Sequence, residues 1–300
     1  MSEITKSEVL SSANALENSL TMRRRLACIR RSVLAHAALI FVSFIFGAPF
    51  LYLLSTSLKT DRNVFSIPIQ WIPDPIAWEN YPRALEFIPF ALYFGNTLFI
   101  SVLNVLFTMV SCSLVAYGFA RIRWFGRDTI FMLVMATLMI PFTVTLIPQF
   151  ILFRQLGWIG TFNPLILPAL GAHPFFIFLL RQFYRTIPFE LSEAARIDGA
   201  SEFGIYWRVI LPLSRPAMVT VALFTFLWNW NDFLGPLIYL SKDEMQTLAV
   251  GLYSYFSVHS STQWGLVLAA ATIMILPVLI LFFFAQRLFI QGISMTGTKG

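Results

Sequence analysis

The side chains best suited to chemistry are few in this chain and form no catalytic pattern. His36, His173 and His259 are far apart and have no clustered partner, so each fits a packed or interfacial histidine better than a metal ligand. The chain has no G-x-x-x-x-G-K-[ST] phosphate loop, no H-E-x-x-H zinc helix and no G-x-S-x-G nucleophile turn. Cys28 lies in a basic tail and Cys112 in an apolar stretch, so we expect no disulfide. The sequence therefore predicts neither an enzyme nor a metal site.

Three polar side chains stand inside otherwise apolar stretches, where they are costly unless they face protein or water. Asn229 and Asp232, in "FLWNWNDFL", are three residues apart and can share one helical face, and Asn104 stands in an earlier stretch. These groups could line a path for a polar solute. They could also hold helices together through hydrogen bonds worth about 0.6 kcal/mol each, and the sequence slightly favours that structural role.

The longest stretch that resembles soluble protein is "ELSEAARIDGASEFGIYWRVILPLSRPAM", residues 190–218. A first short helix is predicted over residues 189–198. It ends at Gly199, which can adopt a positive φ at a helix C-terminus without a Cβ penalty. A second helix follows Ser201 and is predicted to stop before Pro212.

The first of these short helices combines small side chains with surrounding charge. Ala194 and Ala195 present almost no side chain, and Glu190, Glu193 and Arg196 surround them. A partner could approach the backbone closely there. The alternative is a simple linker, but a linker needs only a few residues and this connection has about thirty.

The elements that must position these residues are membrane-spanning helices. The chain is 57% hydrophobic and only 12% charged, so it has too little polar surface for a soluble globule of 300 residues. A membrane span needs about 20 predominantly apolar residues. The predicted fold is all-α and polytopic, with six spans at residues 33–54, 90–118, 129–152, 163–180, 218–240 and 264–284.

The distribution of Lys and Arg predicts the topology. With both termini cytoplasmic, 16 of the 21 Lys and Arg residues lie on the cytoplasmic side, as the positive-inside rule requires. This bias also explains the net charge of +6 without a nucleic-acid partner. The predicted organisation is a basic tail (1–31), a first span with a Pro-rich external loop (32–89), a core transmembrane domain (90–287) that includes a cytoplasmic connection (181–215), and a C-terminal tail (288–300).

The 190–212 region also carries a family resemblance. "EAARIDGASEFGIYWRVILP" is similar to the cytoplasmic signature of bacterial ABC importer permeases: Glu-Ala-Ala, three residues, Gly, nine residues, an aliphatic residue, one residue and Leu-Pro. The aliphatic position is Val209, where the family usually has isoleucine. "DRNVFSIPIQWIPDPIAWENYPRAL", "WNWNDFLGPLIYL" and "QRLFIQGISMTGTKG" resemble the external loop, fifth span and C-terminal tail of the shorter permease in maltose-type transporters.

The resemblance implies a type I ABC importer permease in the bacterial inner membrane. Such a subunit pairs with a second, homologous permease and works with a dimer of cytoplasmic ABC ATPases and an extracytoplasmic solute-binding protein. ATP and Mg would bind in the ATPases, and this chain would bind no cofactor. The residues implied in ATPase coupling are Glu190, Glu193, Ala194, Ala195, Arg196, Asp198, Gly199, Val209, Leu211 and Pro212.

Two other classes of protein remain as alternatives. A secondary transporter would bind a coupling ion at an intramembrane acid such as Asp232, but it usually shows an internal repeat and none is evident. A membrane-embedded enzyme is disfavoured by the missing motifs. For the solute, the absence of Lys and Arg from the six spans favours a neutral sugar, with a polyol phosphate such as glycerol phosphate as the alternative.

Overall fold

The described part of the chain is entirely helical, as predicted. The computed structural model describes the backbone of residues 2–257 and 263–296 and the side chains of residues 29–256 and 263–286; every regular element in these ranges is a helix. His259, Lys299 and the side chains of Lys6 and Cys28 lie outside the described residues.

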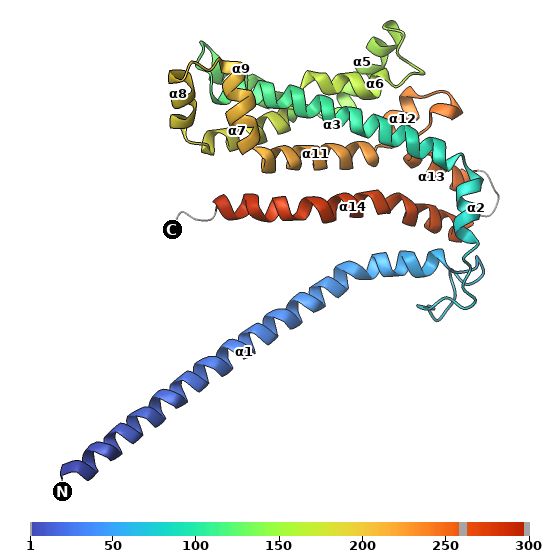
Figure 1. Ribbon diagram of the computed structural model, residues 1–300. Coiled ribbons are helices and arrows are strands. Elements are labelled where there is room, and N and C mark those ends of the chain that lie inside the picture. The colour runs from blue at the N-terminus through green and yellow to red at the C-terminus, as the bar shows by residue number, and fades with distance from the viewer. Residues whose placement is uncertain (1, 258–262, 297–300) are drawn as a thin grey trace.

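Helix α1 (Ser2–Ser57) is much longer than the first predicted span. It runs without a break through residue 31, where the sequence placed the end of the tail, and its apolar part, Ile29–Ser57, has no buried residue in its most apolar window. Figure 1 shows α1 leaning away from the other helices and meeting them only near its C-terminal end. An apolar helix without protein cover needs lipid or another protein around it.

Helix α3 (Phe90–Ala120) is the centre of the bundle. It packs most extensively against α11 (Arg215–Trp230) and α7 (Pro174–Thr186), and α14 (Trp264–Thr296) packs on α11 (Figure 1). Its contact face is rich in small and hydroxyl side chains, including Ser101, Thr108, Cys112 and Ala116, all of them buried. Such residues let membrane helices approach closely and hydrogen-bond across the interface.

Four helical runs of the described chain are long and apolar enough to span a membrane, and two bent helix pairs pass the same test together. The predicted number of six spans is reached when each bent pair forms one span, although the second pair includes residues 202–213, which the sequence placed in the cytoplasmic connection. The single runs are Ile29–Ser57, Phe90–Ala120, Asn163–Thr186 and Trp264–Gln286. The pairs are Arg127–Met139 with Phe142–Gln155, bent by 97°, and Glu202–Leu213 with Arg215–Trp230, bent by 78°.

Several spans are interrupted where the sequence has proline. The third comprises α4 (Arg127–Ala136), a 3-10 turn (Thr137–Met139) and α5 (Phe142–Gln155), with the bend at Pro141. The fourth comprises α6 (Asn163–Ile166), a 3-10 segment (Leu167–Gly171) and α7. Proline frees a carbonyl and clashes with the preceding turn, so such breaks are tolerated only where other groups satisfy the backbone.

The predicted end of the fifth span is wrong. The prediction placed one helix over residues 218–240, but α11 ends at Trp230 and a separate short helix, α12 (Leu234–Tyr239), follows. The remaining elements are α2 (Asn80–Phe87) in the Pro-rich loop, the 3-10 turn Asp243–Met245, and α13 (Leu248–Ser257).

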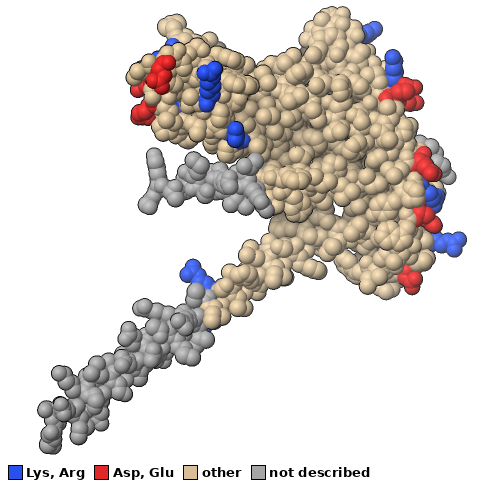
Figure 2. Space-filling model, viewed as in Figure 1, with Lys and Arg blue, Asp and Glu red and all other residues tan. Residues whose placement is uncertain are grey.

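Charged side chains gather at opposite ends of the molecule. Figure 2 shows Lys, Arg, Asp and Glu at the two ends with a belt free of charge between them, as a bilayer requires. Figure 1 places the N-terminal end of α1, the helices α8 and α9, and the C-terminal end of α14 toward one end, and α2, α12 and α13 toward the other.

Cysteine labelling tests which end faces the cytoplasm. Asp198 and Asp243 lie in exposed turns at opposite ends of the bundle. In a Cys28→Ser background, we expect an impermeant maleimide added to intact cells to label Asp243→Cys and to leave Asp198→Cys unlabelled, because the positive-inside rule places residue 198 inside. Permeabilised cells control for reactivity. Labelling of residue 198 in intact cells would contradict the predicted topology.

Candidate functional site

The 189–213 segment consists of two short helical rods at one end of the bundle. The first is α8 (Phe189–Ile197). The second runs from Glu202 to Leu213 and comprises α9 (Glu202–Ile205), a π-helical turn (Tyr206–Ile210) and α10 (Leu211–Leu213). Figure 1 shows α8 and α9 beside each other at the end of the bundle where α3 ends. The second rod packs against the bundle, because Ile205, Tyr206 and Ile210 are buried in one cluster with residues of α3 and α7.

The turn between the two rods has the geometry of a Schellman cap. The amide of Ala200 donates to the carbonyl of Ala195 (2.9 Å) and the amide of Gly199 donates to that of Arg196 (3.0 Å). Gly199 has φ +83°. Ser201 then caps the second rod, because its hydroxyl accepts from the amide of Gly204 at 3.2 Å. The predicted cap at Gly199 and the predicted N-cap at Ser201 are both confirmed.

The positive φ at Gly199 gives a testable expectation. No atom lies within 4 Å of a Cβ added there, so a substitution meets backbone strain and no steric clash. We expect Gly199→Val to destabilise the cap by about 1–3 kcal/mol, and Gly199→Asn to cost much less, because asparagine visits the left-handed region. Hydrogen exchange of the α8 amides measures the difference. Equal protection of the α8 amides from exchange in the two variants would show that the positive φ at Gly199 does not limit the stability of the cap.

The prediction that the second helix stops before Pro212 is wrong. The rod continues through Pro212 to Leu213, and the reason is the π-helical turn: the amide of Leu211 donates to the carbonyl of Tyr206, five residues back. The wider turn changes the hydrogen-bond register immediately before Pro212. The proline then stands in the first turn of α10, where a missing amide is tolerated.

The outer surface of the segment carries both charge and large apolar side chains. Glu190, Glu193, Ala194, Arg196 and Asp198 are exposed. So are Leu191, Ile197 (86% exposed), Phe203 (65%) and Trp207 (59%), and the rings of Phe203 and Trp207 stack with centroids 6.4 Å apart. Exposed apolar groups of this size, ringed by charge, are typical of an interface with another protein.

The two alanines of the signature differ in their surroundings. Ala194 is exposed, whereas Ala195 is only partly exposed and packs against the cluster of buried residues that includes Leu180, Tyr184 and Ile210. Of the two, only Ala194 belongs to the outer surface. A bulky residue at position 195 would disturb the packing of the segment itself.

One connection between the segment and the bundle passes through Glu202. The Arg196 Nε donates to Glu202 Oε1 at 2.7 Å, and the hydroxyl of Tyr117, on α3, donates to Glu202 Oε2 at 2.8 Å. The Arg196 guanidinium holds the pKa of the Glu202 carboxyl below its usual value. The carboxylate is therefore ionised at neutral pH, and its contribution to stability is lost only as the pH falls through this lowered pKa.

A second connection passes through Arg121, which directly follows α3. Its Nη2 donates to the carbonyl of Ile187 at 2.7 Å, and its guanidinium lies 4.7 Å from the ring centroid of Phe189. Arg121 is 1% exposed, and its Nε and Nη1 have no hydrogen-bond partner among the described residues. The end of α3 is thus fixed to the residues that begin α8.

Neither connection is visible in the sequence. Arg121 stands where the positive-inside rule already explains an arginine, and Tyr117 lies inside an apolar span. Arg181 is a further case: its guanidinium lies 4.0 Å from the ring of Phe131 and donates to Asp128 at 3.1 Å, joining α7 to α4. The only sequence signal for these roles is that an arginine directly follows, or directly ends, an apolar run.

The three polar residues of the predicted solute path do not lie together. Asn104 and Asn229 both line a cavity of about 410 Å³ between α3, the start of α7 and α11, but Asp232 is not among its lining residues. The expected shared face of Asn229 and Asp232 is wrong because α11 ends at Trp230. Asp232 instead accepts from the amide of Gly235 at 3.1 Å, at the start of α12.

Asn104 has the structural role that the sequence slightly favoured. Its side-chain amide donates to the carbonyls of Ile100 and Leu165, both at 2.9 Å, and so joins α3 to α6. Asn229 donates to the carbonyl of Thr225 on its own helix at 2.8 Å. Of the three residues of the predicted path, only Asn104 therefore has a described side-chain hydrogen bond to a helix other than its own or the one that it precedes.

Comparison with known proteins gives a consistent result. The family model described as binding-protein-dependent transport system inner membrane component matches residues 109–295. The chain is 36% identical over 265 residues to the arabinooligosaccharides transport system permease protein AraQ of Halalkalibacterium halodurans, covering 87% of this chain and 94% of that protein. It is 34% identical over 261 residues to the probable starch degradation products transport system permease protein AmyC of Thermoanaerobacterium thermosulfurigenes, covering 87% and 94%.

A solved structure supports the fold. A chain of a bacterial ABC transporter involved in the import of the acidic polysaccharide alginate superposes with a TM-score of 0.76 at 24% identity, covering 85% of this chain and 95% of that one. The family model matches more than half of this chain, and the relatives cover most of it. The chain belongs to the family of binding-protein-dependent transport system inner membrane components, the permeases of ABC importers.

Proposed function

We propose that this chain is the permease subunit of an ATP-driven sugar importer, and that the 189–213 segment is where a cytoplasmic ATPase docks. The observation that carries the proposal is the segment itself: two capped rods at one end of the bundle that expose Ile197, Phe203 and Trp207 among charged side chains. A soluble ATPase needs such a surface on its membrane partner.

The assembly that fits this surface contains a second, homologous permease, two ABC ATPases and an extracytoplasmic solute-binding protein. ATP and Mg bind in the ATPases, and this chain contributes the membrane path and the mechanical link. Closure of the ATP sites moves the docked rods. Because Arg121 and the Tyr117–Glu202 pair join those rods to α3, the movement reaches the helices that surround the 410 Å³ cavity.

A neutral sugar suits the described path better than an anion. No Lys or Arg is among the residues that line the cavity between α3, α7 and α11, and Asn104, Asn229 and Trp228 are. Amides and aromatic faces recognise neutral carbohydrate, whereas a phosphate is bound most often by Lys and Arg side chains. The names of the relatives AraQ and AmyC refer to carbohydrate transport, which supports the same assignment.

Uptake into proteoliposomes tests the proposal. The chain is reconstituted with the second permease, the ATPase and the binding protein that copurify with it, and uptake of labelled arabinotriose, maltotriose and lactose is measured. We expect uptake of at least one sugar to require enclosed ATP and the binding protein and to persist when an ionophore removes ion gradients. Uptake that does not require ATP but is abolished by the ionophore would establish a secondary transporter instead.

A further inference from the structure

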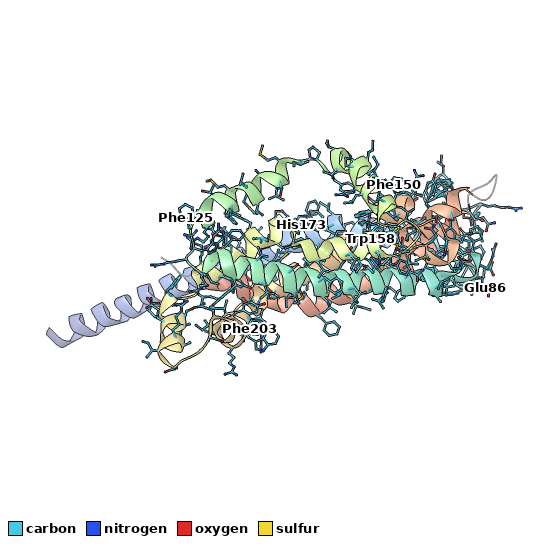
Figure 3. The ribbon with its side chains drawn as sticks, turned by 90° about the horizontal axis from the view of Figure 1, so that it is seen from above. Glu86, Phe125, Phe150, Trp158, His173 and Phe203 are labelled. Atoms are coloured by element: carbon cyan, nitrogen blue, oxygen red, sulfur yellow. The ribbon has the colours of Figure 1, made fainter. Side chains whose placement is uncertain are left out.

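The fourth span is broken in the middle of the bundle. Between Leu167 and His173 the chain leaves α-helical geometry, and Ala172 has φ +57°, which is rare for a residue with a side chain. Figure 3 shows His173 midway between the labelled Phe125 at one end and Glu86 at the other. Irregular backbone at membrane depth is tolerated only when it is buried in protein or lines a cavity that holds water.

Side chains of α3 stabilise this break. Asn104 donates to the carbonyl of Leu165 (2.9 Å), and Ser111 donates to that of Ala169 (3.0 Å). The sulfur of Cys112 accepts from the amide of His173 at 3.2 Å. The irregular backbone of the break is therefore stabilised by specific hydrogen bonds from α3. Strained or irregular backbone of this kind is concentrated at functional sites.

The break forms one wall of the 410 Å³ cavity, and residues of α3, α5, α7 and α11 form the others. Its polar lining is Asn104, Thr108, His173, Thr225 and Asn229, and its aromatic lining includes Phe176 and Trp228. The ring of Trp228 lies 5.0 Å from that of Phe176 and 5.4 Å from that of His173, and Trp228 is 48% exposed. A volume of several hundred Å³ with a few polar groups is the size of a small-ligand site.

His173 presents one hydrogen-bond donor to this cavity. Its Nδ1 accepts from the amide of Phe175 at 3.3 Å and so caps α7. In the neutral ring the proton is therefore on Nε2, and no described group accepts it. This places a donor at the point where the span is broken.

Asn229 presents the complementary acceptor. Its Nδ2 donates to the carbonyl of Thr225 at 2.8 Å. Its Oδ1 accepts no hydrogen bond from the described residues. A sugar hydroxyl both donates and accepts, and the apolar face of a sugar ring packs on flat aromatic side chains. One N–H donor, one amide oxygen and an exposed indole therefore match a neutral polyhydroxyl ring and offer no counter-charge to an ion.

We infer that the cavity at the broken fourth span is a sugar subsite, in which His173 Nε2 donates to a hydroxyl, Asn229 Oδ1 accepts from one, and Trp228 covers a ring face. This inference rests on the proposed function and assigns part of the specificity to this subunit. Asp232, which caps α12 outside the cavity, has no part in it.

The test uses the reconstituted transporter and the neutral oligosaccharide that the wild type imports, together with its monodeoxy analogues. The matched pair is Asn229→Leu and Asn231→Leu, because both asparagines donate to the carbonyl four residues back at 2.8 Å and only Asn229 lines the cavity. We expect Asn229→Leu to raise the KM roughly three- to tenfold for the parent sugar and to change the ranking of the analogues. Asn231→Leu should leave both unchanged.

His173 needs two variants because it also caps α7. His173→Phe removes both ring nitrogens, and His173→Asn keeps a cap acceptor on a shorter side chain. Both should raise the KM if Nε2 contacts the sugar, whereas recovery in His173→Asn alone would show a capping role only and overturn the assignment. Unchanged analogue ranking in every cavity variant, with wild-type uptake intact, would also overturn it. Absence of ATP-driven uptake in the wild type would instead refute the proposed function.

Discussion

Replacing Trp207 with serine is expected to weaken the association between this chain and its ATPase by about thirtyfold or more. Trp207 is 59% exposed and stacks on Phe203, which is itself 65% exposed. Large aromatic side chains at the centre of protein interfaces each contribute about 2 kcal/mol or more to binding. The chain itself should still fold, since the substitution opens no buried cavity.

The measurement is the amount of ATPase that copurifies with the complex, together with sugar-stimulated ATP hydrolysis. Trp78→Ser is the matched control: Trp78 is 67% exposed but lies in the loop before α2, at the opposite end of the bundle. We expect the control to retain its ATPase. Retention of the ATPase by Trp207→Ser to within a factor of two would mean that this face of the segment is not the docking surface.

The sequence predicted the local features well because each depends on nearby residues. The apolar runs of about 20 residues, the positive φ at Gly199 and the N-cap at Ser201 follow from hydropathy and from the conformational preferences of single residues. The segment 189–213 was distinguished by its polarity and by its resemblance to a family signature. Its position at one end of the bundle was also predictable, because a polar segment between two spans must lie outside the membrane.

The errors and omissions arise where contacts between distant residues decide the outcome. Pro212 appeared to end a helix, but a π-helical turn before it changes the hydrogen-bond register. The end of α11 at Trp230 separates Asn229 from Asp232, and nothing in an apolar sequence marks that end. The cavity depends on Cys112 and Ser111 of α3 holding the break near His173, about sixty residues along the chain, and no local pattern contains such a pairing.

Arg121 provides the second large expected effect, because it joins the last turn of α3 to the start of α8. Replacing it with methionine leaves the buried carbonyl of Ile187 without its donor and removes the guanidinium from the ring of Phe189. An unsatisfied buried carbonyl costs about 1–3 kcal/mol. We expect Arg121→Met to keep its ATPase, since the outer surface of α8 is unchanged, but to lower sugar uptake per ATP hydrolysed by about tenfold or more.

Two comparisons separate this coupling role from a general loss of stability. Arg123→Met removes an exposed arginine two residues away and should transport normally. In a double-mutant cycle, Phe189→Leu should add little to Arg121→Met, because residues that contact each other are not additive. Arg121→Lys keeps the charge but cannot both bond the Ile187 carbonyl and lie flat on the ring, so it should recover uptake only in part. If Arg121→Met hydrolyses ATP and imports sugar in the wild-type ratio, movement of the docked rods reaches the cavity by another route, and the Tyr117–Glu202 and Ser113–Tyr206 hydrogen bonds are connections that remain to carry it.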